Sequence, residues 1–176
     1  MPQISFSDLG ELTGALGIGS IAVLAVLMVL DTLSPIHTLI ETEADSQTWA
    51  LFVAVPIIVI SYVAGIICVA LGNTARTTFS SVSPPEPEWV SIPESLLNIV
   101  TVQYRNAKRK IDVLDGATVA FLMLAIGLAL EGFHFGLPAL GAMLATISVA
   151  TSTLCFFIAG RTEIGLINFV RGTMKS

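Results

Sequence analysis

The sequence predicts an all-α integral membrane protein: four transmembrane helices with a cytoplasmic amphipathic helix between spans two and three. Hydrophobic residues make up 54% of the 176 residues and charged residues only 12%, about half the charge of a soluble domain. Mean hydropathy is +0.86. Four long runs carry almost no charge, so the bilayer is the natural solvent of this chain. We treat residues 1–176 as one membrane domain.

The first span is expected at about residues 13–33. Its uncharged part, Thr13–Leu30, is 18 residues long and is closed by Asp31. At 1.5 Å per residue and with its flanks included, it can cross a hydrocarbon core of ~30 Å. Pro35 should bend or end this helix. The preceding segment contains no Lys or Arg, so we expect a retained span and not a cleaved signal peptide.

The second span is expected at about residues 48–72. Trp49 opens it, and an indole ring suits the headgroup level. Pro56 predicts a local kink in its first half. The two cysteines, Cys68 and Cys155, both lie within apolar runs, so we expect no disulfide bond.

The third and fourth spans are expected at about residues 114–132 and 137–160. The uncharged part of the third, Gly116–Leu130, has only 15 residues between Asp115 and Glu131. Its helix must therefore extend past one or both charges to cross the membrane. The six residues EGFHFG separate the two spans and predict a tight helical hairpin.

The cationic residues predict the orientation. Five lie between spans two and three and three follow span four, whereas the N-terminal segment and the other two loops have none. These residues are Arg76, Arg105, Lys108, Arg109 and Lys110 in the connector, and Arg161, Arg171 and Lys175 in the tail. The positive-inside rule places both groups in the cytoplasm. We therefore expect a multi-pass protein of the bacterial inner membrane with cytoplasmic N- and C-termini.

The cytoplasmic connector, residues 73–113, begins with Asn73–Val90, where Pro84, Pro85 and Pro87 favour an extended linker, and continues with a capping box at 91–94. Apolar residues then recur at helical spacing: Leu96, Val100, Tyr104, Ala107, Ile111 and Leu114. This pattern predicts an amphipathic helix that runs into span three at Gly116 or turns sharply there. The β-branched patch at 98–102 leaves a strand as the alternative. In the cytoplasmic tail, 161–176, a second interfacial helix is expected at 163–171.

Four cations of this helix, Arg105, Lys108, Arg109 and Lys110, form a basic segment that carries half of all Lys and Arg residues. They are expected to contact anionic lipid headgroups, each worth ~1 kcal/mol, or to dock a soluble partner, and the two roles can coexist. The net charge of −5 argues against direct nucleic-acid binding by the chain.

Small residues in span four recur on a heptad-like spacing that suits close helix packing in lipid. They are Gly141, Ala145, Ser148, Ser152, Cys155 and Ala159. The face they form can pack inside the four-helix bundle or form an oligomer contact around a symmetry axis. Span four also carries hydroxyl groups that could line a narrow pore: Thr146, Ser148, Thr151, Ser152 and Thr153.

A polar cluster, Asp31, His37, Glu131 and His134, maps to the outer ends of spans one and three. These groups could simply mark the water boundary. Metal binding, proton relay, pH sensing and bis-histidine haem ligation are the alternatives. No hydrolase, phosphate-binding or dinucleotide-binding motif occurs, so we expect no enzyme, no catalytic residue, no metal and no cofactor.

The chain resembles the small four-span membrane subunits of bacterial anti-phage systems, KwaA of the Kiwa system most of all. The features that carry this resemblance are the chain length, the four spans, the very short outer loops and the basic connector Gln103–Asp115. The resemblance implies a tetrameric inner-membrane sensor of infection that recruits a cytoplasmic DNA-binding effector, and it assigns no residue a role. We therefore expect a non-enzymatic homo-oligomeric sensor or scaffold whose partners are membrane lipids and a soluble protein. The alternative is a small oligomeric ion channel.

Overall fold

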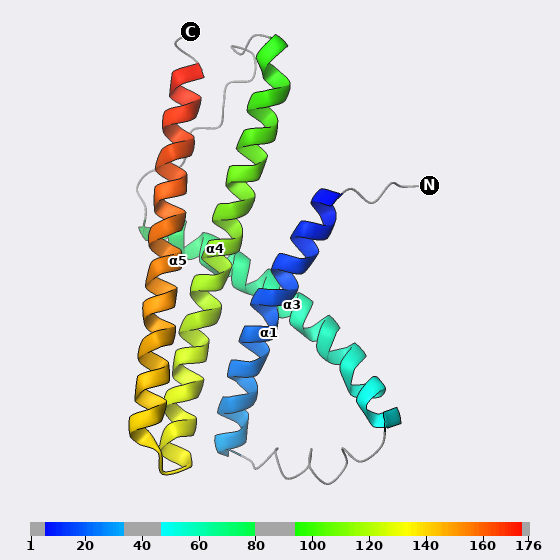
Figure 1. Ribbon diagram of the computed structural model, residues 1–176, viewed down its shortest axis with the longest axis vertical. Helices are drawn as coiled ribbons and strands as arrows, with labels where there is room; N and C mark the ends of the chain where they lie inside the picture. Colours follow the sequence, from blue (N-terminus) through cyan, green and yellow to red (C-terminus); the bar gives the residue numbers. More distant parts are fainter. Residues whose placement is uncertain (1–5, 34–46, 80–93, 174–176) are drawn as a thin grey trace.

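The computed structural model describes residues 6–33, 47–79 and 94–173, and these residues form four long helices (Figure 1). They are α1 (Phe6–Leu33), α3 (Gln47–Phe79), α4 (Glu94–His134) and α5 (Pro138–Thr173). Each contains a stretch that is long and apolar enough to cross a bilayer. The described part of the chain is thus all-helical and has the pattern of a multi-pass membrane protein.

Helices α4 and α5 form an antiparallel hairpin and lie side by side along most of their length (Figure 1). Gly136 makes the turn with a φ of +70°, a conformation that costs other residues energy. The Leu137 amide donates to the Gly132 carbonyl at 2.9 Å and the Gly136 amide to the Phe133 carbonyl at 3.3 Å. This pair of bonds is the Schellman motif, which satisfies the last carbonyls of a helix.

Helices α1 and α3 cross at a contact made possible by two glycines. A methyl group added at Gly19 would lie 1.5 Å from the Ser61 carbonyl oxygen, and one added at Gly65 would lie 1.9 Å from the Ala15 carbonyl oxygen. Backbones can approach this closely only where side chains are absent. Next to this crossing lies a small buried core formed by Ile18, Ala22, Cys68 and Ala120.

The structure bears on alternatives that the sequence leaves open in the second half of the chain. Helix α4 continues without a break through Asp115–Gly116, so the expected amphipathic helix and span three are one helix. The strand alternative at 98–102 is not found, because these residues are helical. Residues 161–173 of the tail are likewise part of α5. The proline-rich linker and the residues of the capping box before Glu94 lie outside the described residues.

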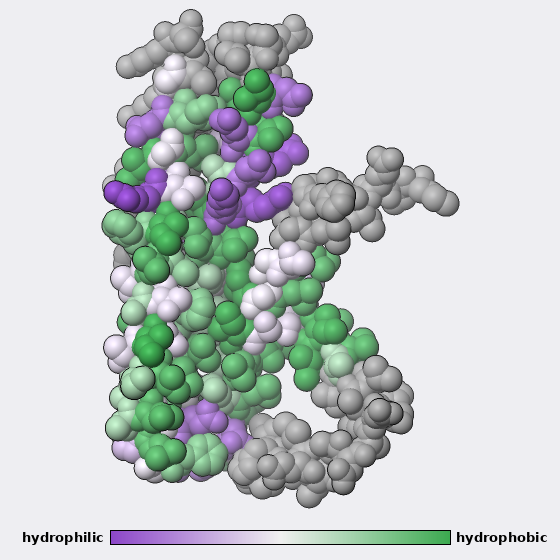
Figure 2. Space-filling view, viewed as in Figure 1, coloured by the Kyte–Doolittle hydropathy of each residue, from purple (hydrophilic) through white to green (hydrophobic). Residues whose placement is uncertain are grey.

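Helix α1 is described as far as Leu33, so the bend or end expected at Pro35 lies outside the described residues. Helix α3 contains Pro56 within its bounds. Figure 2 shows an apolar surface over the lower part of the molecule, with hydrophilic residues gathered over the upper parts of α4 and α5 and at the lower turn. The polar groups thus lie at the two ends of an apolar belt.

Candidate functional site

Helices α4 and α5 are longer than a bilayer requires. With 41 and 36 residues, they extend over ~60 Å and ~54 Å at 1.5 Å per residue, against a hydrocarbon thickness of ~30 Å. Asp115 precedes Glu131 by 16 residues, or ~24 Å along the axis. Residues 94–114 of α4 and 164–173 of α5 continue past the carboxylates Asp115 and Glu163, into the region where hydrophilic residues gather in Figure 2. We call this part the two-helix stalk.

A buried ion cluster lies at the base of the stalk and joins three helices. It consists of Arg76 of α3, Asp115 of α4 and Glu163 of α5. The Arg76 Nε atom donates to Asp115 Oδ2 at 2.6 Å, and Nη2 donates to Asp115 Oδ1. Nη1 donates to Glu163 Oε2 at 3.1 Å. One planar guanidinium thus binds one carboxylate with two bonds and a second carboxylate with a third, the geometry for which arginine is suited.

The surroundings of the cluster exclude most water. The Asp115 side chain is 1% exposed and the Arg76 side chain 9% exposed. The Phe156 ring lies under the guanidinium with 5.1 Å between Cζ and the ring centroid, an arrangement favourable for a cation over an aromatic face. Gly72, one turn before Arg76, allows the approach, because an added methyl group would lie 2.4 Å from the Asp115 carbonyl oxygen.

The cluster explains why α4 and α5 continue through acidic residues at the edge of the apolar belt. A lone carboxylate at this depth favours ending the helix in water, since burying an unpaired charge is costly. Here Arg76 supplies the counter-charge and three hydrogen bonds. Both helices can therefore pass from the apolar belt into the stalk without interruption.

Above the cluster, the two helices of the stalk pack on each other. Ile111 of α4 and Leu166 of α5 are buried together, and Tyr104, Ala107 and Phe169 pack around them. Val100, one more turn along α4, is 2% exposed. The apolar face expected at these positions of α4 is thus covered in part by α5 of the same chain. The Leu96 side chain lies outside the described residues.

The basic segment lies on the outside of the stalk. Arg105, Lys108 and Lys110 are exposed and Arg109 is half-buried. Hydrophilic residues gather over this region in Figure 2. Helix α4 thus presents the four cations beyond the ion cluster, on the part of the chain that extends past the apolar belt.

The small-residue face of α5 lies against α4. Gly141, Ser148, Ser152 and Ala159 are buried, and Ala145 and Cys155 are half-buried. The Ser152 hydroxyl donates to the Thr118 carbonyl at 2.9 Å. A methyl group added at Gly132 would lie 2.6 Å from the Gly141 Cα atom. Within one chain, this face makes the α4–α5 contact.

The outer polar cluster is only partly described. Asp31 and Glu131 are half-buried, His134 is exposed, and His37 lies outside the described residues. The His134 ring meets the Phe135 ring edge to face with centroids 5.2 Å apart. Within residues 6–33, 47–79 and 94–173, no three His, Cys, Asp or Glu side chains are grouped so that they could hold a metal ion.

The ion cluster was not predicted from the sequence, because Asp115 and Glu163 lie 39 and 87 positions after Arg76. Each of the three residues alone is readily interpreted as a charge that marks the end of a membrane span. One available signal was Arg76, which follows a long apolar run and lies 29 positions before the next cation, Arg105. Comparison of the chain with protein-family models, curated proteins and solved structures finds no match.

Proposed function

We propose that the chain is a non-enzymatic, oligomeric sensor or scaffold of the bacterial inner membrane that couples the membrane to a soluble cytoplasmic partner through its two-helix stalk. The stalk and both termini lie in the cytoplasm, as the positive-inside rule requires for a chain with this charge distribution. The resemblance to KwaA makes anti-phage defence the proposed setting.

The observation that carries this proposal is the continuity of α4. One helix extends from the outer turn at His134 to Glu94 beyond the basic segment. The ion cluster fixes it to α3 and α5 where it leaves the apolar belt. A helix held in this way moves as a unit, so a tilt or rotation in the membrane displaces the basic segment of the stalk.

The hydrogen bonds of α5 favour a scaffold over the alternative of an ion channel. The hydroxyl groups of Thr146, Thr151 and Thr153 donate to the carbonyls four residues earlier at 2.7–2.9 Å. The Ser152 hydroxyl bonds to α4. Hydroxyl groups with these partners are accounted for by the packing of helices in lipid, and a water-filled pore is not needed to explain them.

An exposed apolar segment of α3 is consistent with assembly in the membrane. All side chains at 54–60 are exposed, and they include Val55 at 62% and Val59 at 57%. Lipid or a second copy of the chain would cover them in the bilayer. The mass of the detergent-solubilised protein separates the two cases, and a strictly monomeric mass would contradict the oligomeric part of the proposal.

The docking part of the proposal is tested by reversing the four charges of the basic segment, Arg105, Lys108, Arg109 and Lys110, to Glu. Tagged wild-type and variant chains are purified from their native membranes with the product of the neighbouring gene present. We expect a discrete soluble partner with the wild type and its loss with the variant. An unchanged set of bound proteins would contradict docking through the basic segment.

Two controls make this experiment specific. Interchanging Arg and Lys at the same four positions keeps every charge, so the partner should be retained. Because charge reversal can also invert a membrane protein, the side of the membrane that holds the C-terminus must be measured in each variant. A second assay addresses the channel alternative: ion flux in liposomes that is changed by Ser148→Leu would favour a pore.

A further inference from the structure

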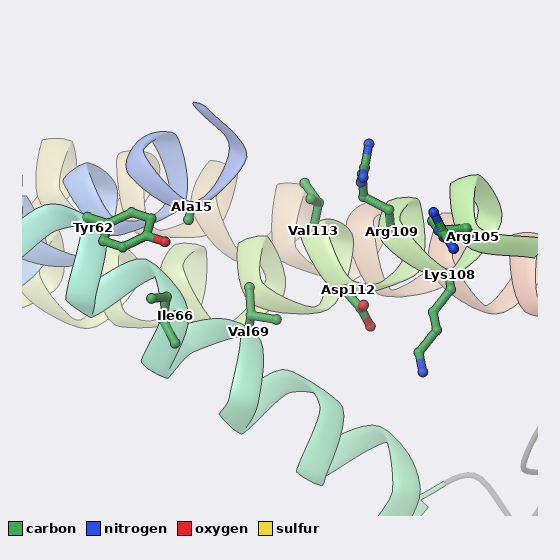
Figure 3. A pocket seen from close by; sticks show the side chains of 9 residues that line it. All are labelled: Ala15, Tyr62, Ile66, Val69, Arg105, Lys108, Arg109, Asp112 and Val113. Atoms are coloured by element: carbon green, nitrogen blue, oxygen red, sulfur yellow. The ribbon is translucent and has the colours of Figure 1, made fainter. Parts of the chain in front are cut away.

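A groove of about 410 Å³ lies where α1, α3 and α4 meet, beside the base of the stalk. Its apolar end is formed by Ala15 of α1, Ile66 and Val69 of α3, and Val113 of α4. Figure 3 shows these side chains next to the crossing of α3 and α4, with the cationic residues further along α4. One end of the groove is therefore apolar and the other end is cationic.

The cationic end is formed by Arg105, Lys108 and Arg109, and Asp112 is the one carboxylate among the residues that line the groove. Three cations against one anion favour a negatively charged occupant. Lys108 and Arg109 extend to opposite sides of α4 (Figure 3), so the cationic end spans more than one small anion. Lys110 belongs to the basic segment but not to the groove.

The two ends lie at the depths that a phospholipid requires. Val113 is two residues from the buried Asp115, at the edge of the apolar belt, and Arg105 is eight residues further along the helix, or ~12 Å at 1.5 Å per residue. The apolar end thus meets the hydrocarbon and the cationic end the headgroup region. Tyr62 lies at the apolar end, on the side of Ile66 away from the cationic residues (Figure 3).

We infer that this groove binds a phospholipid with a net negative headgroup from the adjoining leaflet. Its headgroup lies at the cationic end formed by Arg105, Lys108 and Arg109, and an acyl chain lies against Ile66 and Val69. Basic pockets between transmembrane helices on the cytoplasmic side recognise anionic headgroups in this way. The lipid contacts α1, α3 and α4 together, so its binding stabilises the arrangement of the helices at the base of the stalk.

The test is a lipid titration of the purified full-length chain in detergent, followed by native mass spectrometry. The probes are phosphatidylglycerol and phosphatidylcholine with identical acyl chains. We expect phosphatidylglycerol to bind at least tenfold more tightly. Arg105→Ala with Lys108→Ala should weaken it about 25-fold, at about 5-fold for each surface cation. No partner protein is present, so the result does not depend on the docking function proposed above.

A charge-matched control distinguishes lipid binding in the groove from nonspecific electrostatic attraction of the lipid to the protein surface. Lys110→Ala with Arg161→Ala also removes two exposed cations, but neither residue lines the groove, so the affinity should change less than twofold. Equal losses in the two double variants would overturn the inference. Equal affinity of the wild type for the two lipids would do the same.

The apolar end is tested separately. Ile66→Trp fills the groove and should lower phosphatidylglycerol binding at least tenfold, whereas Ile67→Trp on the neighbouring exposed position should leave it unchanged. Soluble glycerol 3-phosphate supplies the anionic group without acyl chains and should not displace the lipid. Displacement at equal concentration, or full binding by the Ile66→Trp variant, would show a simple anion site and overturn the assignment to a lipid.

Discussion

The Arg76 guanidinium and the Asp115 carboxylate form two parallel hydrogen bonds across 39 positions of the sequence, in a site where Asp115 is 1% exposed. The same guanidinium reaches Glu163 at 3.1 Å. Helix α5 packs chiefly on α4, and Arg76 adds a polar link from α3 to both. The stability of the joint between membrane and stalk should therefore depend strongly on these three side chains.

Asp115→Asn should lower the free energy of unfolding by about 3–5 kcal/mol, because removing one partner leaves Arg76 buried without its main counter-charge. Unfolding by SDS in mixed micelles measures the change. Glu131→Gln, at the half-buried outer end of the same helix, serves as the control and should cost less than about 1 kcal/mol. Wild-type stability of the Asp115→Asn variant would contradict the structural role of the cluster.

Gly19→Ala should separate α1 from α3, because the added methyl group meets the Ser61 carbonyl oxygen at 1.5 Å and the backbones must move apart. We expect a loss of several kcal/mol in the same unfolding assay, in line with overpacking of a tight contact. Gly17→Ala provides a control on the same helix, since nothing lies within 4 Å of the added atom. There the higher helix propensity of alanine should leave stability unchanged or raised by up to about 1 kcal/mol.

Gly136→Ala should destabilise the α4–α5 turn by about 1–2 kcal/mol, because this position has a φ of +70° and a side chain there clashes with the backbone. Gly136→Asn should cost less, since asparagine tolerates the left-handed conformation. Thermal unfolding followed by helical circular dichroism ranks the three proteins. If the Ala variant matched the wild type, the turn conformation would be contradicted.

Ile111→Ala should loosen the stalk while the membrane-embedded part of the chain stays intact, because Ile111 packs mainly on Leu166 and its neighbours. Hydrogen exchange at residues 98–110 should become at least tenfold faster, with residues 117–130 unchanged. Ile126→Ala is the matched control, since Ile126 is 60% exposed. Equal exchange in the stalk of the wild type and the Ile111→Ala variant would show that the two helices do not support each other.

The four apolar helices could be predicted from the sequence, because runs such as Thr13–Leu30 are longer than most buried soluble helices and carry no charge. The helical spacing of Tyr104, Ala107 and Ile111 also identified residues of α4 that pack together against α5. Both signals are local and depend on length or period alone.

The ion cluster could not be predicted in this way, although the short third run already required its helix to extend past Asp115 or Glu131. In the sequence, Asp115 and Glu163 are each typical of the end of a membrane span. Their counter-charge, Arg76, belongs to another helix, so the sequence does not show that the two carboxylates are paired. Helices that are far apart in the sequence meet where their backbones approach closely, as Gly72 and Asp115 do. A single sequence does not encode these approaches as a periodic pattern.

The central claim, that the stalk and the outer turn lie on opposite sides of a membrane with the stalk in the cytoplasm, is tested most directly by cysteine accessibility. Gln103→Cys in the stalk and His134→Cys at the outer turn are introduced separately into a chain in which Cys68 and Cys155 are replaced by Ala. A membrane-impermeant maleimide is added to intact spheroplasts. Our account predicts that position 134 is labelled at once and position 103 only after permeabilisation, and the reverse order would contradict it.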